Sequence, residues 1–210
     1  RTAESYLQEK GIVSVTAIIL THAHKDHASG VPALLSTGRV DALIEPNPEP
    51  DGLTGLEGEI LELAKQNKTD IIYNESVITV SLGSVTITVF PPLDPGGTGD
   101  ENELCSVIVV SRGSWEAIIT GDMPSTDERV FADKYVLPDS ELFIAGHHGS
   151  KYSNSLELLF AILPETVIIS VGAQNTYGHP TPEALARFAE VGAQVYRTDE
   201  NGTVTVQIGN

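Results

Sequence analysis

The 210-residue sequence predicts an α/β (α+β) fold, a sandwich of mixed sheets covered by helices. Two observations lead to this prediction. Segments between residues 70 and 120 alternate apolar and polar side chains, which is typical of strands with one buried face. Beyond residue 120, apolar runs alternate with helical patterns, which is typical of crossovers between parallel strands. We find no repeat and no linker, so we expect one domain over residues 1–210.

The first half of the chain opens with a helical pattern that Gly11 closes. A β-branched apolar run follows and predicts a buried strand. Stretches rich in Pro and Gly at 46–52 and 91–103 predict loops. In order, we expect helices at 3–10, 31–36 and 56–65 and strands at 15–20, 40–45, 70–73, 76–81 and 85–90, the last three as an antiparallel meander with turns near Asn74 and Gly83.

The second half continues with two strands and then with alternating helices and strands. Its apolar runs are short and rich in Val and Ile, as buried strands are. Between them lie longer stretches with helical spacing. In order, we expect strands at 106–111, 115–120, 142–145, 166–171, 194–197 and 203–208, and helices at 125–135, 155–163 and 182–192.

The chain is strongly acidic: 12 Lys and Arg stand against 29 Asp and Glu, for a formal net charge of −17. This balance argues against broad non-specific binding to nucleic acid, which needs a basic surface. Two bound divalent cations would offset only about four of these charges, so a polyanion would have to be held locally, at the metals. Such acidity also fits a secreted or salt-tolerant protein.

No apolar run approaches the ~18 residues needed to span a membrane. No signal-peptide pattern opens the chain, and its start at Arg1 has the look of a cut boundary. The single cysteine, Cys105, permits no internal disulfide. We expect it to be a buried, small apolar residue.

The most informative segment reads Thr-His-Ala-His-Lys-Asp-His at 21–27, directly after an apolar run. Imidazole suits zinc, iron or nickel, and carboxylate suits manganese, so the segment predicts a metal site. His22 and His24 leave the same face of an extended chain. Asp26 and His27 diverge unless the backbone turns. The segment could therefore serve two metals, one pair of residues on each; the alternative is a loop of solvated histidines.

The remaining histidines also follow strand-like runs. His147 and His148 come after one apolar run, and His179 lies in a loop after another. Asp122 follows a third run and a glycine, as a bridging carboxylate would. Taken singly, Asp122 is more typical of a turn or helix cap, and His148 and His179 are as readily structural hydrogen-bonding groups as ligands. Together with the 21–27 segment they strengthen the prediction of a metal centre.

With these residues in view, the chain resembles the metallo-β-lactamase superfamily. The superfamily signature H-x-H-x-D-H is matched by His22, His24, Asp26 and His27, and its bridging aspartate by Asp122. Within the superfamily, the chain is most similar to the β-lactamase-like domain of ComEC DNA-uptake proteins and their stand-alone relatives. This similarity rests on Gly-His-His-Gly-Ser-Lys at 146–151, Ile-Ser-Val-Gly at 169–172, Asn-Thr-Tyr-Gly-His-Pro at 175–180 and Arg-Thr-Asp-Glu-Asn-Gly at 197–202. The resemblance implies an αββα sandwich of two mixed sheets flanked by helices.

The chain departs from the superfamily pattern in two places. Many members carry a metal-binding histidine in a segment before the aspartate, where this sequence has Asn102. ComEC-like domains also lack that histidine. The family normally begins with two or more strands before the helix at 3–10. We therefore expect an open first metal site, and either an incomplete sheet or one whose initial strands lie outside the numbered chain.

The resemblance implies a hydrolase with two divalent ions, Zn²⁺ or Mn²⁺. His22, His24 and Asp122 would hold one ion, with water or Asn102 beside it, and Asn102 is also a candidate for contact with substrate. Asp26, His27, His147 and Asp122 would hold the other. Asp26 would orient the attacking hydroxide, and His179 would give a proton to the leaving oxygen. The set expected to hold a phosphate oxygen is His148, Ser150 and Lys151, with Lys151 supplying point charge.

The predicted metal ligands and substrate contacts are compatible with three functions. The first is a metal-dependent phosphodiesterase, a nuclease on one DNA strand during DNA uptake, placed outside the cytoplasm as a domain of a membrane protein with a channel. The second is a secreted hydrolase of small phosphodiesters, such as phosphocholine on cell-wall polymers, which the acidic surface favours. The third is a non-catalytic, metal-stabilised module that binds DNA or docks to a membrane channel.

Overall fold

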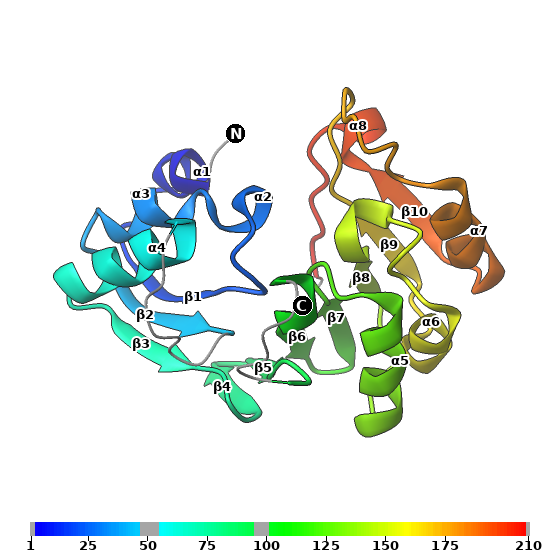
Figure 1. The fold of residues 1–210 in the computed structure, drawn as a ribbon, viewed down its shortest axis with the longest axis horizontal. Coiled ribbons are helices and arrows are strands. Elements are labelled where there is room, and N and C mark those ends of the chain that lie inside the picture. The colour runs from blue at the N-terminus through cyan, green and yellow to red at the C-terminus, as the bar shows by residue number, and fades with distance from the viewer. Residues whose placement is uncertain (1–2, 47–54, 95–100, 209–210) are drawn as a thin grey trace.

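Two sheets lie face to face between two layers of helices (Figure 1) in a computed structural model that describes residues 3–46, 55–94 and 101–208. Residues 47–52 and 95–100 of the two predicted loops lie outside these ranges. The αββα sandwich is thus confirmed. The helices are α1 (Ala3–Glu9), α2 (Lys25–Ala28), α3 (Val31–Leu35), α4 (Gly55–Gln66), α5 (Ser125–Lys134), α6 (Leu156–Ile162), α7 (Pro182–Glu190) and α8 (Thr198–Asn201), with short 3₁₀ turns η1 (Glu101–Leu104) and η2 (Gly146–Gly149).

The smaller sheet has the order β1 (Val15–Ile19), β2 (Val40–Glu45), β3 (Asp70–Tyr73). Its described strands all pair in parallel, so this sheet is not mixed as predicted. Parallel neighbours need crossover connections, which α3 and α4 supply. These helices bury Leu35 and Ile60 against Leu43 of the sheet.

The larger sheet is mixed. Its order is β10 (Gln194–Arg197), β9 (Thr166–Ile169), β8 (Leu142–Ile144), β7 (Trp115–Ile119), β6 (Val107–Arg112), β5 (Val85–Phe90), β4 (Ile78–Leu82). Strands β4 to β7 are antiparallel, and β7 to β10 are parallel. Helices α5, α6 and α7 cover one face and bury Phe131, Leu159 and Phe188 against it. Within the described residues, no helix is both long and apolar enough to cross a membrane.

The two sheets pack through side chains that alternate along each strand. In β6, Val107 and Val109 face the helices, whereas Ile108 faces the other sheet. Ile108 shares a cluster with Ile44 of β2 and, at its edge, Ile19 of β1. This apolar contact fixes the smaller sheet against the larger one.

The predicted meander is wrong in its first strand, because β3 belongs to the smaller sheet. The chain passes from one sheet to the other at Asn74, whose side chain is fully buried. Its Nδ2 donates to the carbonyl of Phe90 at 3.0 Å and to Ser106 Oγ at 2.8 Å. The strand with which β3 pairs, β2, lies far away in sequence. The alternation of residues 70–73 therefore did not reveal to which sheet this strand belongs.

The strand predicted at 203–208 is also wrong, since these residues form no strand. Their alternating Val and Thr fit a strand, yet Val204 packs beside Ala117, Leu142 and Ile168 instead. This cluster lies on the face of the larger sheet opposite the helices. This segment therefore packs an apolar side chain on the face of the sheet and does not pair with the edge of a strand.

Candidate metal centre

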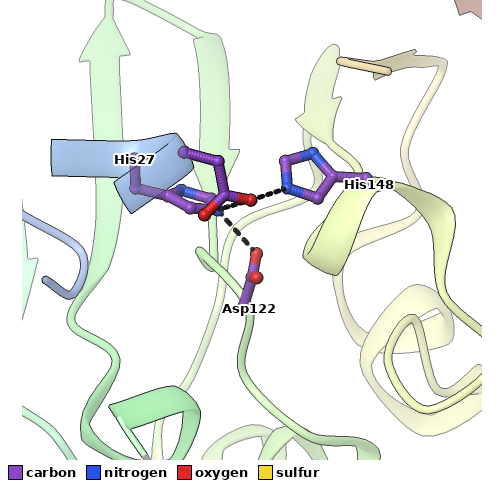
Figure 2. A group of neighbouring side chains, drawn as sticks. His27, Asp122 and His148 are labelled. Carbon is purple, nitrogen blue, oxygen red and sulfur yellow. Dashed lines mark hydrogen bonds and ion pairs between the residues drawn. The ribbon is translucent and has the colours of Figure 1, made fainter. Parts of the chain in front are cut away.

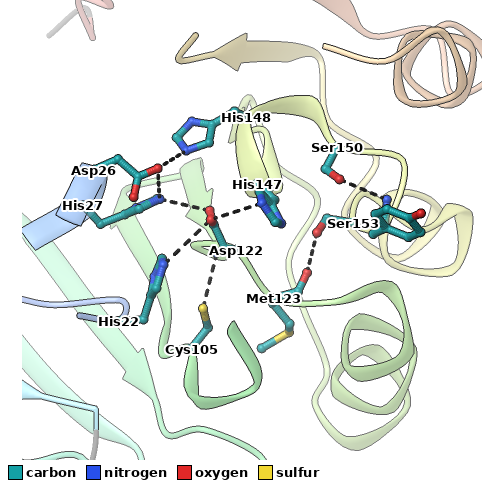
Figure 3. Close-up of polar contacts among 12 residues, drawn as sticks. His22, Asp26, His27, Cys105, Asp122, Met123, His147, His148, Ser150 and Ser153 are labelled. Atoms are coloured by element: carbon teal, nitrogen blue, oxygen red, sulfur yellow. Dashed lines mark hydrogen bonds and ion pairs between the residues drawn. The ribbon is translucent and has the colours of Figure 1, made fainter. Parts of the chain in front are cut away.

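The predicted ligands gather where strands of both sheets end (Figure 3). His22 and His24 follow β1, and Asp26 and His27 lie on the short helix α2. Asp122 follows β7, while η2 after β8 carries the other histidine pair. Because β7 and β8 are parallel, their carboxyl ends meet at one edge of the larger sheet. The smaller sheet brings α2 opposite that edge.

Asp122 is held close to β1 by a tight turn. Gly121 has φ of +60°, and a Cβ there would lie 2.8 Å from Thr21 Cβ. The Asp122 N–H donates to the sulfur of Cys105 at 3.3 Å. Cys105 is buried, as predicted. The position of the Asp122 carboxylate is therefore fixed by a backbone turn that packs directly against Thr21, at the end of β1.

Among the residues that the structure describes, two groups of side chains have the spacing of metal ligands, and they share Asp122. One consists of His22, His24 and Asp122; the other consists of Asp26, His27, Asp122 and His148. Within each group the candidate ligand atoms lie within 4.8 Å of one another. Metal–ligand bonds of about 2.0–2.2 Å place two ligand atoms on one ion at most about 4.4 Å apart, so small side-chain shifts would suffice. The arrangement fits two ions and a bridging carboxylate.

His22 has the environment of a metal ligand. Its side chain is buried, and its Nδ1 lies 3.2 Å from Thr21 Oγ1. Its Nε2 is 3.8 Å from Asp122 Oδ2 and makes no hydrogen bond. Burial and then the charge of His27 lower the pKa of His22 to about 3. The ring is therefore neutral at pH 7, which is the form that binds a metal.

Asp122 is ionised because its partners outweigh its burial. Burial acts to raise its pKa, but contact with His27 and the charges of His27, His147 and His22 lower it to about 2. Its Oδ1 lies 3.1 Å from His27 Nε2 (Figure 2). Burial acts to lower the pKa of His27, yet the contact with Asp122, its charge and that of Asp26 raise it. A cation would meet a fully charged bridging carboxylate.

The ligand group around Asp26 and His27 contains His148, whereas the sequence predicted His147 in this group. His148 Nδ1 lies 2.7 Å from the carbonyl of Ser170. Its Nε2 lies 3.0 Å from Asp26 Oδ2 (Figure 3). When a carbonyl accepts a hydrogen bond from the Nδ1–H group, the lone pair of Nε2 is left for a metal, the usual way a ligating histidine is oriented. His147 Nε2 is 3.6 Å from Asp122 Oδ2. Both rings therefore reach the site, and the assignment of His147 as ligand stays a prediction.

Residues that the sequence did not single out hold these two histidines. His147 and His148 have left-handed backbone, with φ of 47° and 54°, a conformation that costs about 1–3 kcal/mol at each non-glycine residue. The buried side chain of Asn154 bonds to both N–H and C=O of Gly146 and to the carbonyl of Ser150. Buried Glu128 in turn accepts the N–H of Asn154. No local pattern marks Glu128, because helix α5 carries several acids.

A cavity of about 550 Å³ opens over the site. The rings of His179 and His147 are 5.6 Å apart. The cavity is lined by Asn102, His179 and five of the metal-ligand candidates, namely His24, Asp26, Asp122, His147 and His148. Ser150 and Lys151 do not line it. The Ser150 side chain is buried and accepts the N–H of Tyr152, and Lys151 Nζ lies over the Tyr152 ring. For the predicted contact of Ser150 and Lys151 with a phosphate oxygen, this loop would have to change conformation.

Replacing Thr21 with valine tests the orientation of His22. We expect zinc affinity to fall about 10- to 100-fold, the usual loss when a residue that orients a metal ligand is removed. Thr21→Ser keeps the hydroxyl and should retain most of the affinity. Titration of the purified protein against a chromophoric chelator measures both, and equal affinities for the two variants would remove Thr21 from this role.

The family is decided by a match of the metallo-beta-lactamase superfamily model to residues 1–173. The chain belongs to this superfamily. The resemblance to the ComEC type is confirmed by two relatives that match nearly the whole chain. The chain is 29% identical to ComE operon protein 3 of Bacillus subtilis (strain 168), over 98% of this chain and 26% of that protein. It is 28% identical to Recombination protein 2 of Haemophilus influenzae, over 96% of this chain and 23% of that protein.

The chain thus spans about a quarter of the length of these relatives. Solved structures share the superfamily fold at low identity. CmlA, a diiron β-hydroxylase from Streptomyces venezuelae, superposes with a TM-score of 0.57 at 16% identity, over 88% of this chain and 44% of CmlA. Igni18, a metallo hydrolase from Ignicoccus hospitalis, gives 0.53 at 16% identity, over 99% and 85%.

Proposed function

We propose that this metallo-β-lactamase domain is a metal-dependent phosphodiesterase that degrades one DNA strand during DNA uptake. The observation that carries the proposal is the pair of ligand groups that share Asp122. The name of one relative, Recombination protein 2, favours DNA as the substrate. In this proposal the domain lies outside the cytoplasm, in a longer protein with a membrane channel.

The donor set indicates which residues would hold the ions. His22 and His24 would hold one ion, with Asp122 between the two ions. The other would be held by Asp26, His27 and His148, or His147 in place of His148. When bound, two divalent ions supply an activated water and stabilise negative charge on a phosphoryl group. The imidazoles favour zinc, whereas the carboxylates and the Asn102 amide favour manganese.

In this proposal two side chains at the cavity transfer protons. The Asp26 carboxylate is 61% exposed at the cavity and would accept a proton from the attacking water. Burial, followed by the charges of His147 and His148, lowers the pKa of His179. A neutral His179 ring still has one N–H, which would donate a hydrogen bond to the leaving oxygen.

A second candidate keeps the same chemistry on small phosphodiesters. The net charge of −17 favours it, because a strongly acidic surface repels a polyanion. A third candidate, metal-stabilised DNA binding without turnover, has no such support from charge. Substrate comparison separates these three.

The test incubates labelled single-stranded DNA with the protein and Mn²⁺ or Zn²⁺, beside a chromogenic phosphodiester. We expect cleavage of DNA, and a rate about 100- to 10,000-fold lower for Asp26→Ala, the range for loss of a positioned proton acceptor. Asp133→Ala, on the exposed side of α5, is the matched control. Cleavage of the small diester alone would favour the second candidate, and binding without turnover the third. Equal rates for Asp26→Ala and wild type would reject this centre.

A further inference from the structure

An exposed aromatic ring stands between the candidate metal centre and a second cavity. Tyr177, in the loop after β9, is 82% exposed. It lines the 550 Å³ cavity over the metal centre and also a neighbouring cavity of about 290 Å³. Asp26, His148 and His179 line both cavities as well. The second cavity, close to the lower limit of small-molecule sites, is thus continuous with the first.

The loop that carries Tyr177 is held in place by Asn175. The Asn175 Nδ2 donates to the carbonyls of Gly172 at 3.0 Å and His179 at 2.8 Å. Its Oδ1 accepts the N–H of His179 at 3.0 Å. The loop is therefore closed on itself by one side chain. Tyr177 projects from a fixed turn, and its exposure is a property of the fold.

Two ring contacts connect Tyr177 to the metal centre. The planes of Tyr177 and His179 differ by only 16°, with centroids 6.0 Å apart. The His179 ring is 5.6 Å from that of His147, whose Nε2 faces Asp122. A flat group laid on Tyr177 would lie at the cavity that the metal-ligand candidates also line.

We propose that Tyr177 is the platform on which a base stacks, the base belonging to a nucleotide next to the cleaved phosphodiester. The proposal rests on the proposed function and narrows its substrate to nucleic acid with unpaired bases. Proteins that bind single strands use exposed aromatic rings in this way, since every base has a flat face. Stacking also needs no positive charge, so it can hold a nucleotide on this acidic protein.

Several polar groups at the second cavity already have hydrogen-bond partners and are therefore not free to read the edge of a base. Thr198 Oγ1 bonds to both N–H and C=O of Val171. The Asn175 amide is occupied as described, and both nitrogens of His148 have partners. The platform should therefore accept all four bases, which suits an enzyme that degrades DNA of any sequence.

The test compares Tyr177→Ala and Tyr177→Phe on a single-stranded oligonucleotide and on the same oligonucleotide with abasic residues around the cleaved bond. We expect Tyr177→Ala to raise KM for the normal oligonucleotide about 5- to 150-fold, equivalent to about 1–3 kcal/mol of stacking per base. Tyr177→Phe should stay within about twofold, since it keeps the stacking face. On the abasic substrate all three proteins should have equal KM. Tyr152→Ala removes another exposed tyrosine, which lines neither cavity, and is the control.

The outcomes separate this proposal from the proposed function. If wild type cleaves a small diester but no DNA, the proposed function fails and stacking fails with it. If wild type cleaves DNA and Tyr177→Ala has unchanged KM, only the stacking role is overturned. An equal rise of KM on normal and abasic substrates would also overturn it, because the loss would then not depend on a base.

Discussion

Replacing Asp122 with asparagine is expected to lower phosphodiester hydrolysis at least about 1000-fold, because removal of even one charge-stabilising group from an active site costs about 10²–10³-fold. Asp122 belongs to both ligand groups, and its carboxylate carries the charge that both ions would share. Asparagine keeps the size but can offer only one weakly basic oxygen. We expect elemental analysis after dialysis to find about two metal ions per wild-type chain and less than one in Asp122→Asn.

The matched control for Asp122 is Asp133→Asn, which removes one carboxylate from the exposed face of α5. It should keep both the rate and the metal content of wild type. A folded Asp122→Asn protein that retains two ions and full activity would contradict a shared carboxylate. Circular dichroism and thermal unfolding of the metal-free proteins check that the variant folds.

The second large effect is expected for Asn154→Ala, which should lower the free energy of unfolding by about 2–5 kcal/mol. Truncation leaves the N–H and C=O of Gly146 without the Asn154 amide, and each buried unpaired group costs about 1–3 kcal/mol. Asn154 also has φ of +63°, which alanine tolerates less well. Because the same bonds hold the turn that presents His147 and His148, metal affinity should fall as well. Urea unfolding and a zinc titration measure the two effects.

Two further variants separate the causes for Asn154. Asn154→Gly relieves the backbone strain but not the lost hydrogen bonds, so it should recover only about 1–2 kcal/mol of the loss. Asn67→Ala removes a half-buried amide that bonds to the carbonyl of Leu63, far from the site, and should leave metal affinity unchanged. Wild-type zinc affinity in a destabilised Asn154→Ala protein would show that the turn does not depend on this side chain.

Much of the fold was predictable because its signals are local. The strands at 40–45 and 85–90 match β2 and β5 residue for residue. Their apolar residues lie within each segment, and the turn residues lie close beside it. The sheet to which β3 belongs was not predictable, because it depends on pairing with a strand some thirty residues away. The segment 203–208 had the same alternation as a strand, and only the apolar cluster around Ala117 shows that it packs differently.

The candidate site was predictable to the same extent. The segment 21–27 names four ligand candidates by residue type alone, and the structure brings them within reach of Asp122. The neighbouring pair His147 and His148 could not be resolved from sequence, since adjacent side chains point in different directions that the backbone sets. Tyr177 lay in a motif used for the family resemblance, but its exposure was not visible there.

By itself, the sequence determined the chemistry of this protein: imidazoles and carboxylates that follow apolar strands, and an acidic surface around them. Tertiary structure decided which of these groups meet. The left-handed turn at residues 147 and 148 points one ring at Asp26 and the other at Asp122, and hydrogen bonds from Asn154 and to the Ser170 carbonyl hold it. Residue type fixes what a side chain can bind, whereas its direction depends on backbone angles and on partners that are distant in the chain.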